Sequence, residues 1–336
     1  MEINVNLKSK SYKVIIEKGI LSKVNNFINK DKKILIVSDD LVPFNYIQCV
    51  QNQFNNAYTY IFQHGEKSKN FDTYLNIINT LMKNNFSRHD YVIALGGGVV
   101  GDVAGFASMT YKRGLHFINI PTTTLSMVDS SIGGKTAINY NSTKNVIGGF
   151  YQPDIVLIDV NTLFTLPKRH FINGTIEALK TGLLGDKELF DILKNSDFKD
   201  NYEEIIYRSL MFKKKIVEED EKENGIRKIL NFGHTFGHAI EAYYHMNGFL
   251  HGEAIGIGML LVSKDKPYYQ DLKDILNKWK VNTNINIGDE NKILKLIEND
   301  KKCDNNMVDL IIVDDFNKVR IDPTLVNDLY KYLGAE

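Results

Sequence analysis

The sequence predicts an α/β N-terminal domain with a parallel sheet, followed by a mostly α-helical C-terminal domain. Three observations lead to this prediction. The chain has 336 residues, too many for one ordinary core. Its first half alternates short apolar runs with helical patterns, and its second half is mostly helical by period and length. We place the domains at 1–155 and 156–336 and expect the functional site in the cleft between them.

The predicted strands of the first half are apolar throughout. They occupy residues 32–37, 58–62, 91–95, 116–120 and 154–159, and a helix is predicted over 71–85. Strands that are apolar on both faces and separated by helices indicate a parallel sheet covered on both sides. Residues 121–149, in contrast, are rich in hydroxyls and glycine without a strong period, which predicts a long functional loop.

The second half shows one strand-like run among helical patterns. Helices are predicted over 189–198, 201–221, the stretch after Asn231, and 272–280, and a strand over 309–313. The apolar spacing in these helices is typical of segments with one buried face.

Composition argues against several function classes. The 41 basic and 41 acidic residues cancel, so no global field recruits nucleic acid or a membrane surface. Cys49 and Cys303 form no metal or redox motif, which favours a cytoplasmic, disulfide-free protein. No run of 18 apolar residues occurs, and we expect neither secretion nor a membrane span.

A glycine-rich turn follows the predicted strand at 91–95. Gly96-x-Gly98-x-x-Gly101 matches the dinucleotide-binding fingerprint in its strand–turn–helix context, where exposed N–H groups favour a pyrophosphate. The glycines could instead serve only a tight turn and close helix packing. The fingerprint also comes late in the chain, and Pro121 stands where an acidic residue is usual, so a variant of the Rossmann-like sheet is expected.

Further candidate functional residues are two lysines in the polar segment and a cluster of histidines. Lys135 and Lys144 could bind phosphate or a carboxylate, or could be surface lysines of a solvated loop. His234 and His238 share a helical face, and His251 follows closely. A metal site, a catalytic base with its supports and packed core residues all remain open. Thr235 stands where a zinc-peptidase helix needs glutamate, which disfavours a metallopeptidase.

Two other charged segments have simple structural interpretations. Glu177 and Lys180 lie three apart on one helical face and could form a weak surface ion pair. The stretch 213–227 looks like a solvated charged helix, and composition alone does not distinguish Lys213 or Arg227 from their neighbours.

Taken together, these segments resemble the 3-dehydroquinate synthase family of sugar-phosphate cyclases. The similar motifs span residues 96–302 in the family's order: "GGGVVGDVAGF", "YKRG", "PTTTLSMVDSSIGGKTAIN", "KNVIGGF", "QPDIVLID", "GTIEALK", "DEKENGIRKILNFGHTFGHAIE", "LHGEAIGIGM" and "NDKK". The resemblance implies conversion of 3-deoxy-D-arabino-heptulosonate 7-phosphate to 3-dehydroquinate, with NAD, one divalent metal (zinc or cobalt) and a homodimer. The sequence offers no reason to expect a nucleic-acid or membrane partner.

The resemblance also implies roles for particular residues. The metal ligands are Glu177, His234 and His251. The catalytic and substrate-binding residues are Arg113, Asp129, Lys135, Lys180, Lys213, Arg227, Asn231 and His238, with a lysine of Lys301–Lys302. Arg113 is expected to reach the substrate of a neighbouring subunit. The dinucleotide contacts are Asp39, Glu66, Lys69, Gly98, Gly101, Asp102, Thr122, Thr123, Lys135, Lys144 and Thr165.

The chain departs from the family pattern at a few positions. Leu41 replaces a common asparagine, His170 a usual glutamate and Thr181 a common tyrosine, and the usual glycine after Lys302 is missing. The rival functions are another sugar-phosphate cyclase, a metal-dependent polyol dehydrogenase and a non-catalytic nucleotide-binding module. Lys213 and Arg227 favour the synthase, because a cyclase of neutral sugars has no substrate carboxylate to bind there.

Overall fold

The chain forms two compact units, Met1–Pro167 (unit 1) and Lys168–Glu336 (unit 2). The computed structural model describes residues 1–141, 143–196, 200–244, 248–284, 288–300 and 303–334. Our expected boundary at residue 155 coincides with the first residue of β9 (Ile155–Ile158). This strand pairs in parallel with β2 (Tyr12–Ile16) and β6 (His116–Pro121), so it belongs with unit 1 and the division lies after it.

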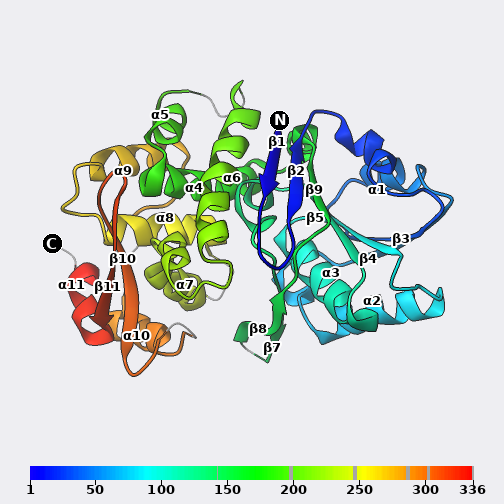
Figure 1. Ribbon diagram of the computed structural model, residues 1–336. Coiled ribbons are helices and arrows are strands. Elements are labelled where there is room, and N and C mark those ends of the chain that lie inside the picture. The colour runs from blue at the N-terminus through cyan, green and yellow to red at the C-terminus, as the bar shows by residue number, and fades with distance from the viewer. Residues whose placement is uncertain (142, 197–199, 245–247, 285–287, 301–302, 335–336) are drawn as a thin grey trace. The chain divides into compact units, whose positions relative to one another are not determined.

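Unit 1 is built on one seven-stranded sheet, which contains the five predicted strands and two N-terminal strands, β1 (Glu2–Val5) and β2, that were not predicted (Figure 1). The other strands are β3 (Lys33–Asp39), β4 (Asn56–Phe62) and β5 (Tyr91–Gly96). Their order is β1-β2-β9-β6-β5-β3-β4, and every pair is parallel except β1–β2. The main helices of the unit are α1 (Phe44–Gln51), α2 (Phe71–Lys83) and α3 (Gly98–Thr110).

Side chains of the central strands alternate between the two faces of the sheet, and both faces are buried, which explains why these sequences are apolar throughout. On β3, Leu35 and Val37 pack into the core that contains α2 and α3 side chains. Ile34 and Ile36 face the opposite way, into the core that contains Ile47 of α1. Both faces of the sheet are therefore covered, which confirms the predicted α/β class of this unit.

The polar segment 121–149 is more ordered than the sequence predicts. After a short π-helical turn (Ser126–Ser130) it forms an antiparallel hairpin of β7 (Lys135–Tyr140) and β8 (Thr143–Phe150). Ile138 is fully buried in the α2–α3 core, which anchors the hairpin. A Cβ at Gly148 would lie 2.1 Å from the carbonyl oxygen of Thr136, so glycine is needed for the two strands to approach.

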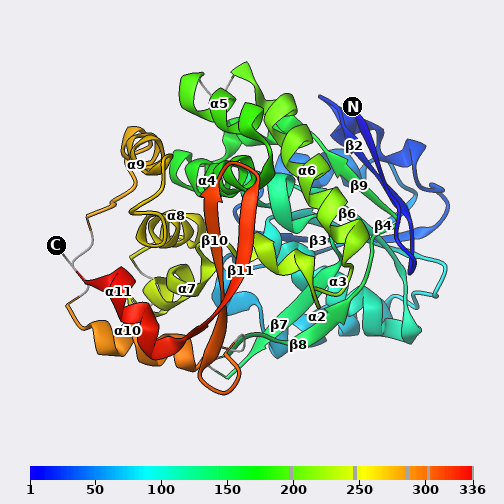
Figure 2. The ribbon, with the colours of Figure 1, turned by 60° about the vertical axis from the view of Figure 1, so that its left-hand side comes forward.

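Unit 2 is mostly helical, as predicted, with one hairpin (Figure 2). Its helices are α4 (Lys168–Gly185), α5 (Lys187–Asn195), α6 (Tyr202–Glu219), α7 (His234–Tyr243), α8 (His251–Leu261), α9 (Tyr269–Lys278), α10 (Glu290–Glu298) and α11 (Tyr330–Leu333). The hairpin joins β10 (Met307–Asp315), where a strand was predicted, to β11 (Lys318–Leu325), which was not predicted. Within the described residues, no helix has the length and apolar character to cross a membrane.

Helix α8 lies in the interior of unit 2, beside α7 (Figure 2). Its residues Gly252–Leu260 are all buried, as expected for a helix that is apolar on every side. The side chain of Glu253 accepts a hydrogen bond from the Leu250 amide (2.8 Å) and pairs with Arg169 (2.7 Å). These contacts fix the start of α8, and therefore the place of His251, its first residue.

Candidate active site

The glycine-rich turn of unit 1 has the geometry of an anion-binding helix start. β5 ends at Gly96, Gly97 caps the helix, and the 13-residue α3 begins at Gly98. A Cβ on Gly97 would lie 3.1 Å from Cγ2 of Thr123, and one on Gly98 would lie 3.3 Å from Oγ of Ser130. Glycine thus keeps space open where the first amides of α3 point outward, as a pyrophosphate requires.

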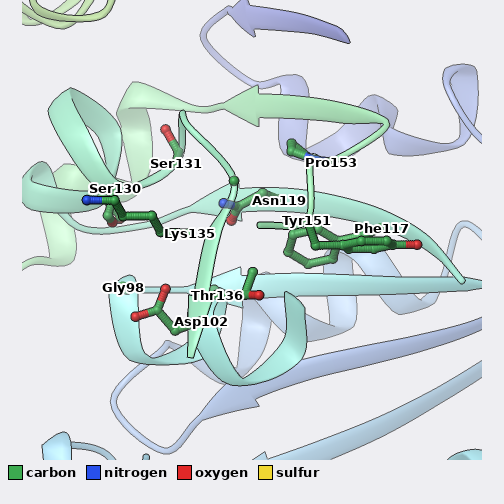
Figure 3. A pocket seen from close by; sticks show the side chains of 14 residues that line it. Gly98, Asp102, Phe117, Asn119, Ser130, Ser131, Lys135, Thr136, Tyr151 and Pro153 are labelled. Carbon is green, nitrogen blue, oxygen red and sulfur yellow. The ribbon is translucent and has the colours of Figure 1, made fainter. Parts of the chain in front are cut away.

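A pocket opens directly beside this turn (Figure 3). Figure 3 shows Asp102, Ser130 and Lys135 gathered near Gly98, with Phe117 and Tyr151 at the other end. Of the predicted dinucleotide contacts, Gly98, Gly101, Asp102 and Lys135 line this pocket. Thr122 is buried and does not line the pocket, and its amide donates to the carbonyl of Gly96 (2.9 Å).

Lys69 links several predicted residues of unit 1. Its ammonium forms an ion pair with Asp102 and donates to the side-chain oxygen of Asn145. Burial by itself lowers the pKa of Lys69, but the carboxylates of Asp102 and Glu66 outweigh this and raise it, so the side chain stays charged. Asn139 completes the network, because its amide donates to Oε1 of Glu66 (2.8 Å).

The remaining predicted residues of unit 1 do not line the pocket beside the glycine-rich turn. Asp39 accepts hydrogen bonds from the amides of Leu41 (3.0 Å) and Val42 (3.2 Å), and burial raises its pKa. The hydroxyl of Thr165 lies 3.2 Å from that of Tyr46. Asp129 and Lys144 are half-buried, in the π-helical turn and in β8 respectively. Arg113 is exposed, in a turn where its φ is 65°.

In unit 2 the structure brings three predicted metal ligands together. One ligand atom each from Glu177, His234 and His251 lie within 4.8 Å of one another. Glu177 comes from the middle of α4, and the histidines are the first residues of α7 and α8. Two imidazoles and one carboxylate are a donor set suited to zinc or a similar divalent ion, with a coordination position left for substrate.

The surroundings of Glu177 support such an ion. Its side chain is 2% exposed, and neither carboxylate oxygen accepts a hydrogen bond from a described residue. The ammonium of Lys180 lies 2.5 Å from Oε2 and donates to the carbonyl of Leu230 (2.7 Å). The surface interpretation of this pair is therefore wrong, because both side chains are buried. Oε2 is paired with the Lys180 cation, whereas Oε1 has no hydrogen-bond donor among the described residues, as expected of a buried carboxylate oxygen that binds a metal ion.

The histidines have different partners. Nδ1 of His234 lies 3.1 Å from the carbonyl oxygen of Phe232, which can only accept, so this nitrogen carries the proton and Nε2 keeps its lone pair. Nδ1 of His238 lies 3.0 Å from Oδ2 of Asp300. The ring of His238 is 5.4 Å from that of His234, but His238 does not join the ligand group formed by the described residues.

The predicted anion-binding residues of unit 2 are also buried. Arg227 is 2% and Lys213 is 7% exposed, so the solvated-helix interpretation is wrong for both. Asp220 accepts hydrogen bonds from the amides of Gly225 (2.7 Å) and Arg227 (3.1 Å), which fixes the loop before η7 (Ile226–Asn231). Burying a full cation is costly, and such groups are kept where an anion is bound or a structural partner exists.

A cavity of about 320 Å³ lies within unit 2. Its lining includes Asn231, whose side chain donates to Glu223 (3.1 Å), and Asp300. Glu223 and Asp300 were not predicted as site residues, although both lie in motifs that resemble the family. Lys301 and Lys302, one of which was expected to hold substrate, lie outside the described residues.

Close packing of α7 against α8 positions the two ligand histidines, and a substitution at Gly258 can test this role of the packing. A Cβ at Gly258 would lie 2.1 Å from the carbonyl oxygen of Gly233, which precedes His234. We expect Gly258→Ala to destabilise the protein by about 1–3 kcal/mol or more, because backbone would have to move. Zinc binding should weaken too. Both effects can be measured by denaturant unfolding and zinc titration.

Gly256→Ala is the matched control for Gly258→Ala on the same helix. Its Cβ would approach side-chain atoms, Cδ2 of Leu276 at 3.1 Å and Cγ2 of Ile176 at 3.4 Å, and no backbone atom is among these nearest neighbours. This variant should lose less stability and keep zinc affinity. Equal behaviour of the two variants would contradict the role assigned to the α7–α8 packing.

Comparisons with known proteins show which family the chain is similar to. Residues 59–173 match the family model "3-dehydroquinate synthase N-terminal", and residues 174–303 match "3-dehydroquinate synthase C-terminal". The chain is 42% identical over 332 residues to the 3-dehydroquinate synthase of Clostridium botulinum, covering 93% of this chain and 95% of that one. It is 40% identical to the enzyme of Streptococcus mutans, with 99% of both chains covered.

Solved structures with the same fold include two cyclases and, with lower TM-scores of 0.61–0.64, several dehydrogenases and reductases. A 2-deoxy-scyllo-inosose synthase complexed with carbaglucose-6-phosphate, NAD⁺ and Co²⁺ superposes with a TM-score of 0.87 at 25% identity, covering 98% of both chains. ValA, a 2-epi-5-epi-valiolone synthase from Streptomyces hygroscopicus with NAD⁺ and Zn²⁺ bound, has a TM-score of 0.87 at 23% identity, covering 98% of this chain and 97% of that one. These structures share the fold, and the family models and relatives confirm the predicted family: the chain belongs to the 3-dehydroquinate synthase family.

Proposed function

We propose that this protein converts 3-deoxy-D-arabino-heptulosonate 7-phosphate to 3-dehydroquinate and phosphate, a step of the shikimate pathway to aromatic amino acids. The observation that carries the proposal is the Glu177–His234–His251 group, in a chain about 40% identical to known synthases along nearly its full length. Enzymes of this kind act as NAD- and metal-dependent lyases, and we propose the same dependence here.

The two cofactors would bind to residues of different units. The glycine-rich turn, Asp102 and Lys135 suit a dinucleotide, and Lys69 and Glu66 would lie at its ribose. Glu177, His234 and His251 suit zinc or cobalt. NAD⁺ with Co²⁺ or Zn²⁺ is present in the related cyclase structures, which supports this pairing of cofactors.

The charges of the site fit a substrate that is both a carboxylate and a phosphate. When bound, the metal and the dinucleotide supply Lewis acidity at a substrate hydroxyl and a reversible hydride acceptor. Arg227 offers a planar fork for the carboxylate, and Lys213 adds a second buried cation. His238, held through Nδ1 by Asp300, presents Nε2 for proton transfer to or from the substrate.

A homodimer with Arg113 serving the partner's substrate is part of this proposal. Lys112 and Arg113 both adopt positive φ, 48° and 65°, next to Gly114 at 120°. Such backbone is costly for non-glycine residues and is kept where a side chain must be presented in one direction. The exposed position of Arg113 is consistent with a contact outside its own chain.

The substrate carboxylate separates this function from that of its structural neighbours. The cyclase in the first structure is complexed with a carbaglucose phosphate, which has no carboxylate. We expect phosphate release from the keto-sugar acid phosphate in the presence of NAD⁺ and zinc, and none from glucose 6-phosphate. The reverse preference would overturn the synthase in favour of a neutral-sugar cyclase.

Arg227→Lys gives a second readout in the same assay. It should raise KM for the acid substrate, because the lysine ammonium cannot form the bidentate contact. Unchanged KM would contradict the carboxylate-binding role of Arg227.

A further inference from the structure

His251 has a carboxylate beside each of its ring nitrogens. Nε2 lies 3.7 Å from Oε1 of Glu177, and Nδ1 lies 3.4 Å from Oε2 of Glu241, near the end of α7. The side chain of Glu241 is 14% exposed, so this contact is largely shielded from solvent. Glu177 belongs to the candidate metal group, but Glu241 does not. The two carboxylates therefore have different tasks toward the same imidazole.

The protonation pattern follows from these contacts. A neutral imidazole carries one N–H and one lone pair. With the proton on Nδ1, the ring donates to Glu241, and the lone pair of Nε2 faces Oε1 of Glu177, a repulsion that a cation bound between these two atoms removes. With the proton on Nε2, the lone pair on Nδ1 would face the Glu241 carboxylate, and two acceptors would repel. Glu241 thus selects the tautomer that can bind a metal through Nε2.

His234 shows the same arrangement with a different acceptor. Its Nδ1 faces the carbonyl oxygen of Phe232 at 3.1 Å. Both ligand imidazoles are therefore held through Nδ1 with Nε2 available, although they begin different helices. The acceptor of His234 is backbone, which no substitution removes. Glu241 is a side chain, so its contribution to His251 can be tested by mutation.

We infer that Glu241 is a positioning residue that holds His251 in the orientation and tautomer needed for metal binding. The inference rests on the metal site of the proposed function. A carboxylate accepting the Nδ1 proton makes the imidazole a stronger ligand, and removal of such outer partners weakens metal affinity about 10–100-fold. Glutamine in its place keeps an acceptor oxygen of the same reach but loses the charge, so it should retain part of the effect.

The test measures zinc dissociation constants of metal-free full-length protein by competition with a chelating indicator. We expect Glu241→Ala to bind zinc about 10–100-fold more weakly than wild type, and Glu241→Gln to fall between them. Cobalt-loaded samples should show a visible absorption spectrum that changes in the alanine variant. Glu298→Gln, an exposed glutamate on α10, is the control and should match wild type in both measurements.

Unfolding of the metal-free proteins separates positioning from packing. Glutamine is isosteric with glutamate, so Glu241→Gln should unfold at the wild-type midpoint, and weaker zinc binding would then arise from the ligand. If the alanine and glutamine variants keep the wild-type zinc affinity and cobalt spectrum, the role of Glu241 is overturned. The proposed metal site and function would be unaffected by that result. Failure of the wild-type protein to bind zinc would instead overturn the proposed metal site and function.

Discussion

Replacing His251 with alanine should abolish metal binding and leave the affinity for NAD nearly unchanged. The substitution removes one of three ligand atoms that lie within 4.8 Å of one another, and Glu177 with His234 is too small a set to hold zinc in four-coordinate geometry. The dinucleotide residues belong to unit 1, whereas His251 belongs to unit 2. Metal content can be measured by elemental analysis, and NAD affinity by calorimetric titration.

His89→Ala provides the control for the loss of an imidazole. His89 is exposed in unit 1 and is not part of the candidate ligand group. This variant should keep the wild-type metal content. Full metal content in His251→Ala would contradict the ligand assignment, and a large loss of NAD affinity would contradict the separation of the two binding functions.

Lys180→Met should destabilise the metal-free protein strongly. Glu177 and Lys180 are both at least 97% buried, and the substitution leaves the carboxylate without its neighbouring cation. Removing one partner of a buried ion pair costs about 3–5 kcal/mol. The Leu230 carbonyl also loses its donor. Denaturant unfolding of metal-free wild type and variant gives the difference in free energy.

Zinc should restore part of the stability that Lys180→Met loses, because an ion bound to Glu177 supplies the missing positive charge. Lys187→Met is the control, since Lys187 pairs with Asp191 at 2.6 Å, close to the 2.5 Å of the buried pair, but is 58% exposed. That change should cost no more than about 1 kcal/mol. Equal stability of metal-free Lys180→Met and wild type would contradict the importance of the buried pair.

Much of the fold follows from local sequence patterns. The runs around β3 and β5 read as buried strands because both of their faces enter apolar cores. The β7–β8 hairpin could not be predicted in this way, because its sequence is polar and glycine-rich. The contacts that order it are distant in the chain: Ile138 enters the α2–α3 core, and Asn139 binds Glu66.

Sequence patterns alone predicted less of the candidate site than of the fold. Helical spacing pairs His234 with His238, yet the structure groups His234 with His251 and Glu177, each from the start or interior of a different helix. Family resemblance, not spacing, identified this group in advance. The partners that orient the rings could not be identified, because Asp300 lies 62 residues from His238 and Glu241 lies 10 from His251.

The central claim is that the protein eliminates phosphate from its substrate while regenerating NAD in every turnover. The most direct measurement follows phosphate release and absorbance of NADH together, with zinc, excess keto-sugar acid phosphate and only catalytic NAD⁺. We predict that the phosphate released exceeds the NAD⁺ supplied many times over, with no net NADH. No phosphate release in the presence of metal, or NADH accumulating in step with substrate consumed, would contradict the claim.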